Sequence, residues 1–83
     1  MRSAAQIVTD LAAQAASVGF DQGSNLLPNA LKSLASGNTG AACGQLGAFI
    51  NQAQAQAGKK LTVSQAAALI AAANSAKAAL GCP

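Results

Sequence analysis

The sequence predicts an all-α fold, a small bundle of four short antiparallel helices that is rich in alanine. Apolar residues recur at steps of three and four through most of the chain, which places them on one face of each helix. Clusters of Gly, Asn, Ser and Thr interrupt this pattern at short intervals. Short connections favour antiparallel neighbours, so residues 1–83 are expected to form a single helical-bundle domain.

The strongest helical pattern is a hairpin over residues 41–80. Its apolar positions are Ala42, Leu46, Phe49, Ile50, Ala53 and Ala57 in the first helix, and Ala66, Leu69, Ile70, Ala73 and Leu80 in the second. Gly58 is placed to end the first helix in a left-handed conformation. Residues 62–65 (Thr-Val-Ser-Gln) fit a capping box for the second helix. Leu61 and Ala66, on either side of the cap, are expected to form a hydrophobic staple.

Two shorter helices precede the hairpin. The first is expected from Ser3 or Ala4 to about Val18, and the second from Ser24 or Asn25 to Ala35. Their inward residues are expected to be Ile7, Leu11, Ala15 and Val18, and then Leu27, Ala30, Leu31 and Leu34. Pro28 is tolerated only in a first turn, so the second helix either begins close to it or is kinked there. Asn38 or Thr39 is expected to cap the helix that follows.

Gly44 and Gly47 fall inside the third helix. Each interior glycine costs roughly 1 kcal/mol of helix stability relative to alanine. We interpret the pair as sites where a neighbouring helix approaches the backbone closely.

The core is expected to be thin. Hydrophobic residues make up 52% of the chain, but most of them are alanine and only 2% of the chain is aromatic. Alanine favours a helix yet buries little area per residue. A covalent crosslink would therefore help so small a domain to stay folded.

The two cysteines predict such a crosslink. In a hairpin that turns near residue 60, Cys43 at the start of one helix lies beside Cys82 at the end of the other. We therefore predict a Cys43–Cys82 disulfide, the alternative being two unrelated thiols in a cytosolic protein. A disulfide implies an oxidising compartment. Residues 1–5 are not followed by the apolar region of a secretory signal, which favours a domain excised from a larger extracellular protein.

The residue inventory argues against an enzyme. The chain has no His, Trp or Tyr, and its only carboxylate side chains are Asp10 and Asp21. A hydrolytic triad, a His-based metal site and a zinc cysteine cluster are excluded, so we expect no catalytic, cofactor-binding or metal-binding residues. The net charge of +3 is spread along the chain, unlike the basic stripe of a nucleic-acid binder. No apolar run is long enough for a transmembrane segment.

Several stretches of the chain resemble a known family. They are 25–27 (Asn-Leu-Leu), Leu31, 36–39 (Ser-Gly-Asn-Thr), 42–43 (Ala-Cys), 45–52 (Gln-Leu-Gly-Ala-Phe-Ile-Asn-Gln), 58–62 (Gly-Lys-Lys-Leu-Thr), 65–66 (Gln-Ala) and 69–70 (Leu-Ile). Together they resemble the FIMAH-type helical module of secreted and cell-surface proteins of bacteria and archaea. Ala53 and Ala76 stand where such modules are expected to carry a larger aliphatic residue. The resemblance implies an extracellular accessory domain and brings no functional residues with it.

We therefore expect a noncatalytic accessory, interaction or spacer domain of a secreted or cell-surface protein. Its partners would be another protein, a cell-envelope component or neighbouring domains of the parent chain. The uncharged amide side chains of the polar faces suit water-mediated contacts with such partners. The alternative is a self-associating structural subunit whose small-residue faces pack together. A third hypothesis is a hydrophobe-carrying bundle, which needs a cavity left by alanine.

Overall fold

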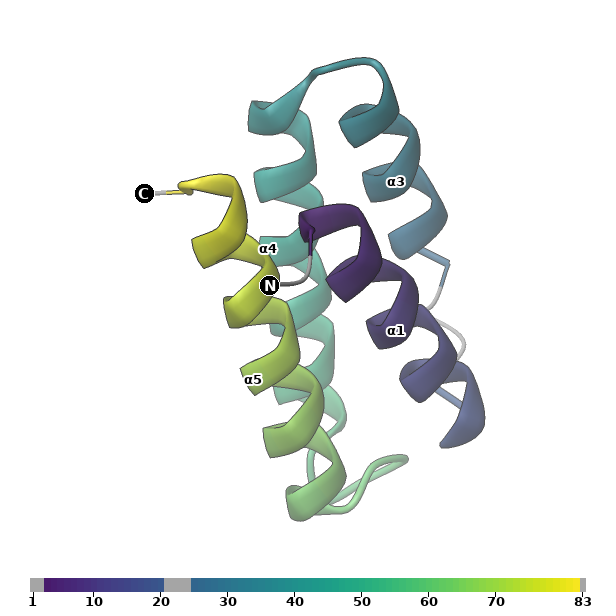
Figure 1. Cartoon of the computed structure of the whole chain (residues 1–83). Coiled ribbons are helices and arrows are strands. Elements are labelled where there is room, and N and C mark those ends of the chain that lie inside the picture. Colours follow the sequence, from purple (N-terminus) through teal and green to yellow (C-terminus); the bar gives the residue numbers. More distant parts are fainter. Residues whose placement is uncertain (1–2, 21–24, 83) are drawn as a thin grey trace.

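The computed structural model describes residues 3–20 and 25–82, and over these residues it is an all-α bundle. Its helices are α1 (Ala4–Ser17), α3 (Leu27–Ala35), α4 (Thr39–Gln56) and α5 (Val63–Leu80). In Figure 1, α1 and α4 run downwards while α3 and α5 run upwards. The molecule measures 35 × 20 × 19 Å. The predicted fold class, a small four-helix bundle with one disulfide, is confirmed.

Each helix packs against two others. α4 lies between α3 and α5, and α1 closes the bundle by contacting α3 and α5 (Figure 1). Residues 57–62 connect the end of α4 to the start of α5, while the Cys43–Cys82 disulfide joins the opposite ends of the same two helices. The α4–α5 hairpin is therefore closed at both ends. Its two helices are longer than α1 and α3.

The core centres on two phenylalanine rings. Phe20 and Phe49 are 1% and 0% exposed, and their ring centroids lie 5.5 Å apart in an edge-to-face arrangement. The other buried apolar residues are Val8, Leu11, Ala15, Leu27, Ala30, Ala42, Leu46, Ala53, Leu61, Ala66, Leu69, Ala73 and Ala76. Because so many of these are alanines, the aromatic pair supplies an outsized share of the buried apolar area.

The inward face of α1 differs in part from the prediction. Val8 is fully buried, whereas Ile7 and Val18 are half-buried and pack against the edge of the core. Ile7 and Val8 are adjacent and both border the apolar stripe of the helix. The position of α1 between α3 and α5 turns Val8 inward and leaves Ile7 at the rim. Leu11 and Ala15 are buried, as predicted.

The end of α1 directs Phe20 into the core. The backbone N–H of Phe20 donates to the carbonyl of Ala15 at 2.9 Å, and that of Gly19 donates to Ala16 at 3.1 Å. This pair of bonds defines a Schellman motif, in which a hydrophobic residue beyond the helix contacts its last turn. Phe20 and Ala15 are both buried, so the motif ties the helix end to the aromatic pair.

α3 begins at Leu27, later than Asn25, and the other predicted start, Ser24, lies outside the described residues. Pro28 occupies the first turn of this helix. The first N–H groups of a helix have no partner within it, so proline is tolerated there. Of the two alternatives for Pro28, the helix start is therefore correct.

The caps of α4 and α5 are as predicted. The Asn38 side-chain oxygen accepts a hydrogen bond from the backbone N–H of Ala41 at 3.2 Å. Thr62 Oγ1 accepts from the N–H of Gln65, and Gln65 Oε1 accepts from the N–H of Thr62, both at 3.0 Å. This reciprocal pair is a complete capping box. Leu61 is buried beside it and anchors the entry to α5.

The interpretation of Gly44 and Gly47 as sites of close helix approach is wrong. A Cβ atom built at either position would meet no heavy atom within 4 Å. Gly44 is exposed and Gly47 is half-buried, and both have ordinary helical backbone conformations. The two glycines therefore weaken α4 without gaining a contact in return.

Replacing these glycines should stabilise the domain. We expect Gly44→Ala and Gly47→Ala each to raise the free energy of unfolding by about 0.5–1 kcal/mol, because alanine lowers the entropy lost on helix formation. Urea denaturation followed by circular dichroism would measure the change. Gly58→Ala is the matched control and should destabilise, since Gly58 has a φ of +79°. Loss of stability in both helix variants would mean that the open space beside α4 is filled in solution.

Truncation of the central ring should have the largest effect in the core. Phe49→Ala is expected to lower the free energy of unfolding by roughly 3–5 kcal/mol, because it removes a fully buried ring and its edge contact with Phe20. Thermal and urea unfolding would report the change. Val63→Ala serves as the control, since Val63 is 70% exposed and its truncation should be nearly neutral. Equal melting curves for Phe49→Ala and the wild type would contradict the core assignment.

Candidate functional site

The disulfide is the one predicted site that the structure assembles. Cys43 lies near the start of α4 and Cys82 follows the end of α5. Their Cα atoms are 5.9 Å apart, and the bond closes a sequence separation of 39 residues. Both cysteines are half-buried. The covalent link therefore clamps the two longest helices together at the end opposite their connecting turn.

Gly81 sets the position of Cys82. Gly81 has a φ of +74°, a conformation that residues with a Cβ adopt only under strain. The backbone N–H of Cys82 donates to the carbonyl of Lys77 at 2.9 Å, which completes another Schellman motif. The chain thereby turns back at the end of α5, and the sulfur of Cys82 reaches that of Cys43.

Of the two carboxylate side chains, that of Asp10 lies in the described part of the chain and that of Asp21 does not. Asp10 is half-buried on α1 and its Oδ1 accepts a hydrogen bond from Gln6 Nε2 at 3.2 Å. Asp21 lies outside the described residues. Over residues 3–20 and 25–82, no three His, Cys, Asp or Glu side chains gather at one place, and no pocket is found there. The cavity required by the hydrophobe-carrying hypothesis therefore has no support in this part of the chain.

The amide-rich surface is smaller than the sequence implies. Among the amides of the predicted polar faces, Asn51, Gln52, Gln54 and Asn74 are exposed. Gln65 is held in the capping box, and Gln45 Oε1 accepts a hydrogen bond from the Ser33 hydroxyl at 3.2 Å. The amide oxygens of these two side chains are engaged within the fold.

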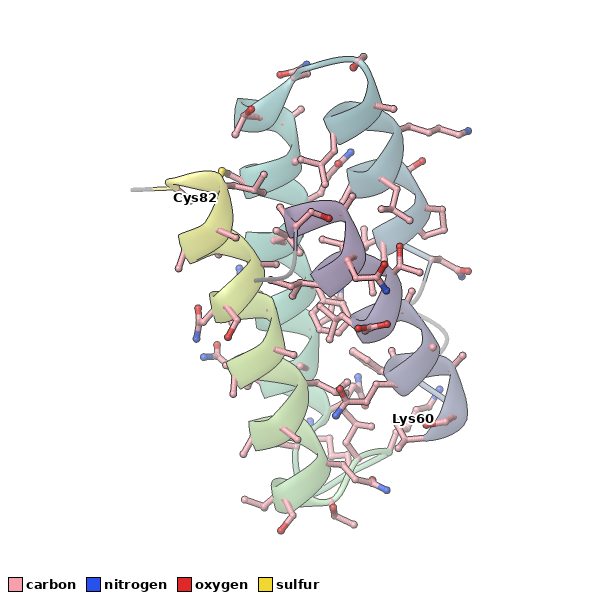
Figure 2. All side chains as sticks on the ribbon, in the orientation of Figure 1. Lys60 and Cys82 are labelled. Carbon is pink, nitrogen blue, oxygen red and sulfur yellow. A yellow bond between two sulfur atoms is a disulfide. The ribbon has the colours of Figure 1, made fainter. Side chains whose placement is uncertain are left out.

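The turn between α4 and α5 and the start of α5 carry two exposed lysines and an exposed valine. Lys59 and Lys60 are exposed, and Figure 2 shows Lys60 at the end of the bundle opposite Cys82. Val63, in the first turn of α5, is 70% exposed and is the exposed large hydrophobic residue of the described chain. Val63 was not predicted to be exposed. It precedes Ala66 by three positions and Ile70 by seven, so the helical period gives no signal that it faces outward.

None of the helices in the described ranges combines the length and the hydropathy that crossing a bilayer requires. Fold and site together define a small helical bundle stapled by one disulfide. Comparison with protein-family models, with curated proteins and with solved structures gives no match for this chain.

Removal of the disulfide should destabilise the domain strongly. Cys43→Ser combined with Cys82→Ser is expected to lower the free energy of unfolding by roughly 4 kcal/mol, the chain-entropy value for a loop of 39 residues. For a domain of this size the melting temperature should fall by roughly 15–30 °C. Calorimetry of the wild type with and without a thiol reductant should give the same change. The double variant is the control, because the reductant should leave its melting temperature unaltered.

Proposed function

We propose that this chain is a noncatalytic accessory module of a secreted or cell-surface protein, similar to FIMAH-type modules. It would contact other proteins, neighbouring domains or a cell-envelope component. The observation that carries the proposal is the disulfide between α4 and α5. The resemblance over residues 45–52 and 58–62 supports the same assignment.

The disulfide supports an extracellular location because the folded domain depends on it for stability. The buried set contains more alanines than large aliphatic residues, so the core supplies little hydrophobic stabilisation. Small domains with such cores depend on crosslinks, and those crosslinks persist where thiols are not kept reduced. A protein that uses Cys43–Cys82 for stability is therefore suited to the exterior of the cell or a periplasm.

The path of the chain favours an interaction module over an in-line spacer. Figure 1 shows the start of α1 and the end of α5 in the same half of the bundle. A longer chain that entered through α1 and left after α5 would gain little length from the bundle. The domain would instead project to one side, with the α4–α5 turn at its far end.

Self-association is the second candidate function, and the outer face of α5 favours it. Val63, Ala67, Ala71 and Ala78 are exposed, and their spacing places them along one side of the helix. This face carries no charge, so like-charge repulsion would not oppose the docking of a second copy. Sedimentation equilibrium at rising protein concentration separates the two functions, since a strictly monomeric domain excludes a structural subunit.

The proposed location predicts the redox state of the protein in its source cells. We expect fractionation and immunodetection to place the chain outside the cytosol with both cysteines oxidised. Maleimide labelling under denaturing conditions should then modify neither thiol until a reductant is added. A cytosolic enzyme and a secreted protein of the same cells serve as fractionation controls. Recovery of the chain in the cytosol with two reactive thiols would overturn the proposal.

A further inference from the structure

The turn between α4 and α5 is held in one conformation by backbone hydrogen bonds. The carbonyl of Gln56 accepts from the N–H of Lys59 at 2.9 Å and from that of Leu61 at 3.1 Å, and the N–H of Gly58 donates to Leu61 at 2.7 Å. Ala57 is extended and Gly58 is left-handed, the conformations of a type II turn. Leu61 is 1% exposed and fixes the turn to the core. The backbone that presents Lys59 and Lys60 is therefore ordered before any partner arrives.

Lys59 and Lys60 are two of the three charged residues in the α4–α5 hairpin, and they are adjacent. α4 contains no charged residue, and in α5 only Lys77 is charged. Lys59 and Lys60 are exposed, and the structure gives their amino groups no ion pair with any residue that it describes. Two adjacent positive charges on an ordered turn therefore face solvent beside two largely uncharged helices. A negatively charged partner would complement them.

Val63 adds an apolar contact beside this positive charge. It is 70% exposed in the first turn of α5, and it follows the buried Leu61 by two positions. A mixture of amino groups and one aliphatic side chain suits a protein surface, where acidic and apolar residues alternate over short distances. A nucleic acid is a poorer fit, because its binding gains affinity from many basic residues along the phosphate backbone and two lysines release few counterions.

The turn lies far from the end of α5. Figure 2 shows Lys60 and Cys82 at opposite ends of the bundle. On the geometry of the proposed module, the turn lies at the end that projects away from the parent chain. A separate protein can therefore approach it directly.

We propose that residues 57–64, which comprise the α4–α5 turn and the start of α5, form a docking surface for an acidic face of another protein. Lys59 and Lys60 pair with carboxylates of the partner, and Val63 packs against an apolar side chain between them. This inference rests on the proposed function and names the chemistry of the partner. It requires no movement of the bundle, since the turn is already ordered.

Titration with poly-L-glutamate, followed by amide chemical shifts of the oxidised full chain, tests the proposal. Shifts should concentrate in residues 57–64. Lys59→Gln combined with Lys60→Gln should raise the dissociation constant by about two- to thirtyfold, the range for the loss of two exposed ion pairs. Lys32→Gln combined with Lys77→Gln is the matched control, because it removes the same charge elsewhere and should leave the affinity within twofold. Added salt should weaken binding of the wild type.

Other outcomes overturn the proposal. Shifts spread over the whole surface, or equal losses in both double variants, would mean that net charge alone attracts the probe. Tighter binding to polygalacturonate or to phosphatidylglycerol vesicles than to poly-L-glutamate would assign the turn to a different class of partner. An oxidised, extracellular chain that does not bind poly-L-glutamate would refute this inference while leaving the proposed location intact.

Discussion

The covalent bond between Cys43 and Cys82 is the constraint on which the rest of the bundle depends. It fixes the start of α4 against the end of α5, while the connecting turn fixes the other ends of the same helices. The hairpin then offers a preset surface on which α1 and α3 pack. Without that closure, the two helices would be held only by their connecting turn and by a core in which Ala53, Ala73 and Ala76 bury little apolar area.

The buried alanines explain why a bundle this small needs such a closure. They allow helices to approach closely, but each contributes few carbons to the core. Ala53 and Ala76 are both 0% exposed and pack fully in the core. The large side chains that remain are gathered around Phe20 and Phe49. The bundle thus combines a small core around the aromatic pair with a covalent bond at one end of the α4–α5 hairpin.

Most of the fold could be predicted from the sequence because local signals agree with the tertiary structure. The period of the apolar residues predicts α4 and α5, and the capping box at Thr62 and Gln65 marks the start of α5. Details that depend on neighbouring helices could not be predicted in this way. The choice between Ile7 and Val8 is set by the rotation of α1 between α3 and α5, and adjacent residues of similar hydrophobicity carry no signal for it.

The candidate site, too, was predictable where local sequence signals suffice and unpredictable where packing decides. The Cys43–Cys82 pairing follows from hairpin geometry, which a turn signal near residue 60 already implies. Gly44 and Gly47 were misread because a helical glycine has the same sequence signature whether it faces a neighbour or open space. The outward position of Val63 depends on where the stripe of α5 faces, and that direction is fixed only by packing.

The position of the exposed lysines inside the disulfide ring has a consequence for proteolysis. Lys59 and Lys60 lie between Cys43 and Cys82, and cleavage after a lysine is a common route of attack on exposed turns. A cut there opens the ring but releases no fragment, because the bond still ties both halves together. The nicked chain keeps α4 and α5 in one covalent molecule, so cleavage at this exposed turn separates nothing.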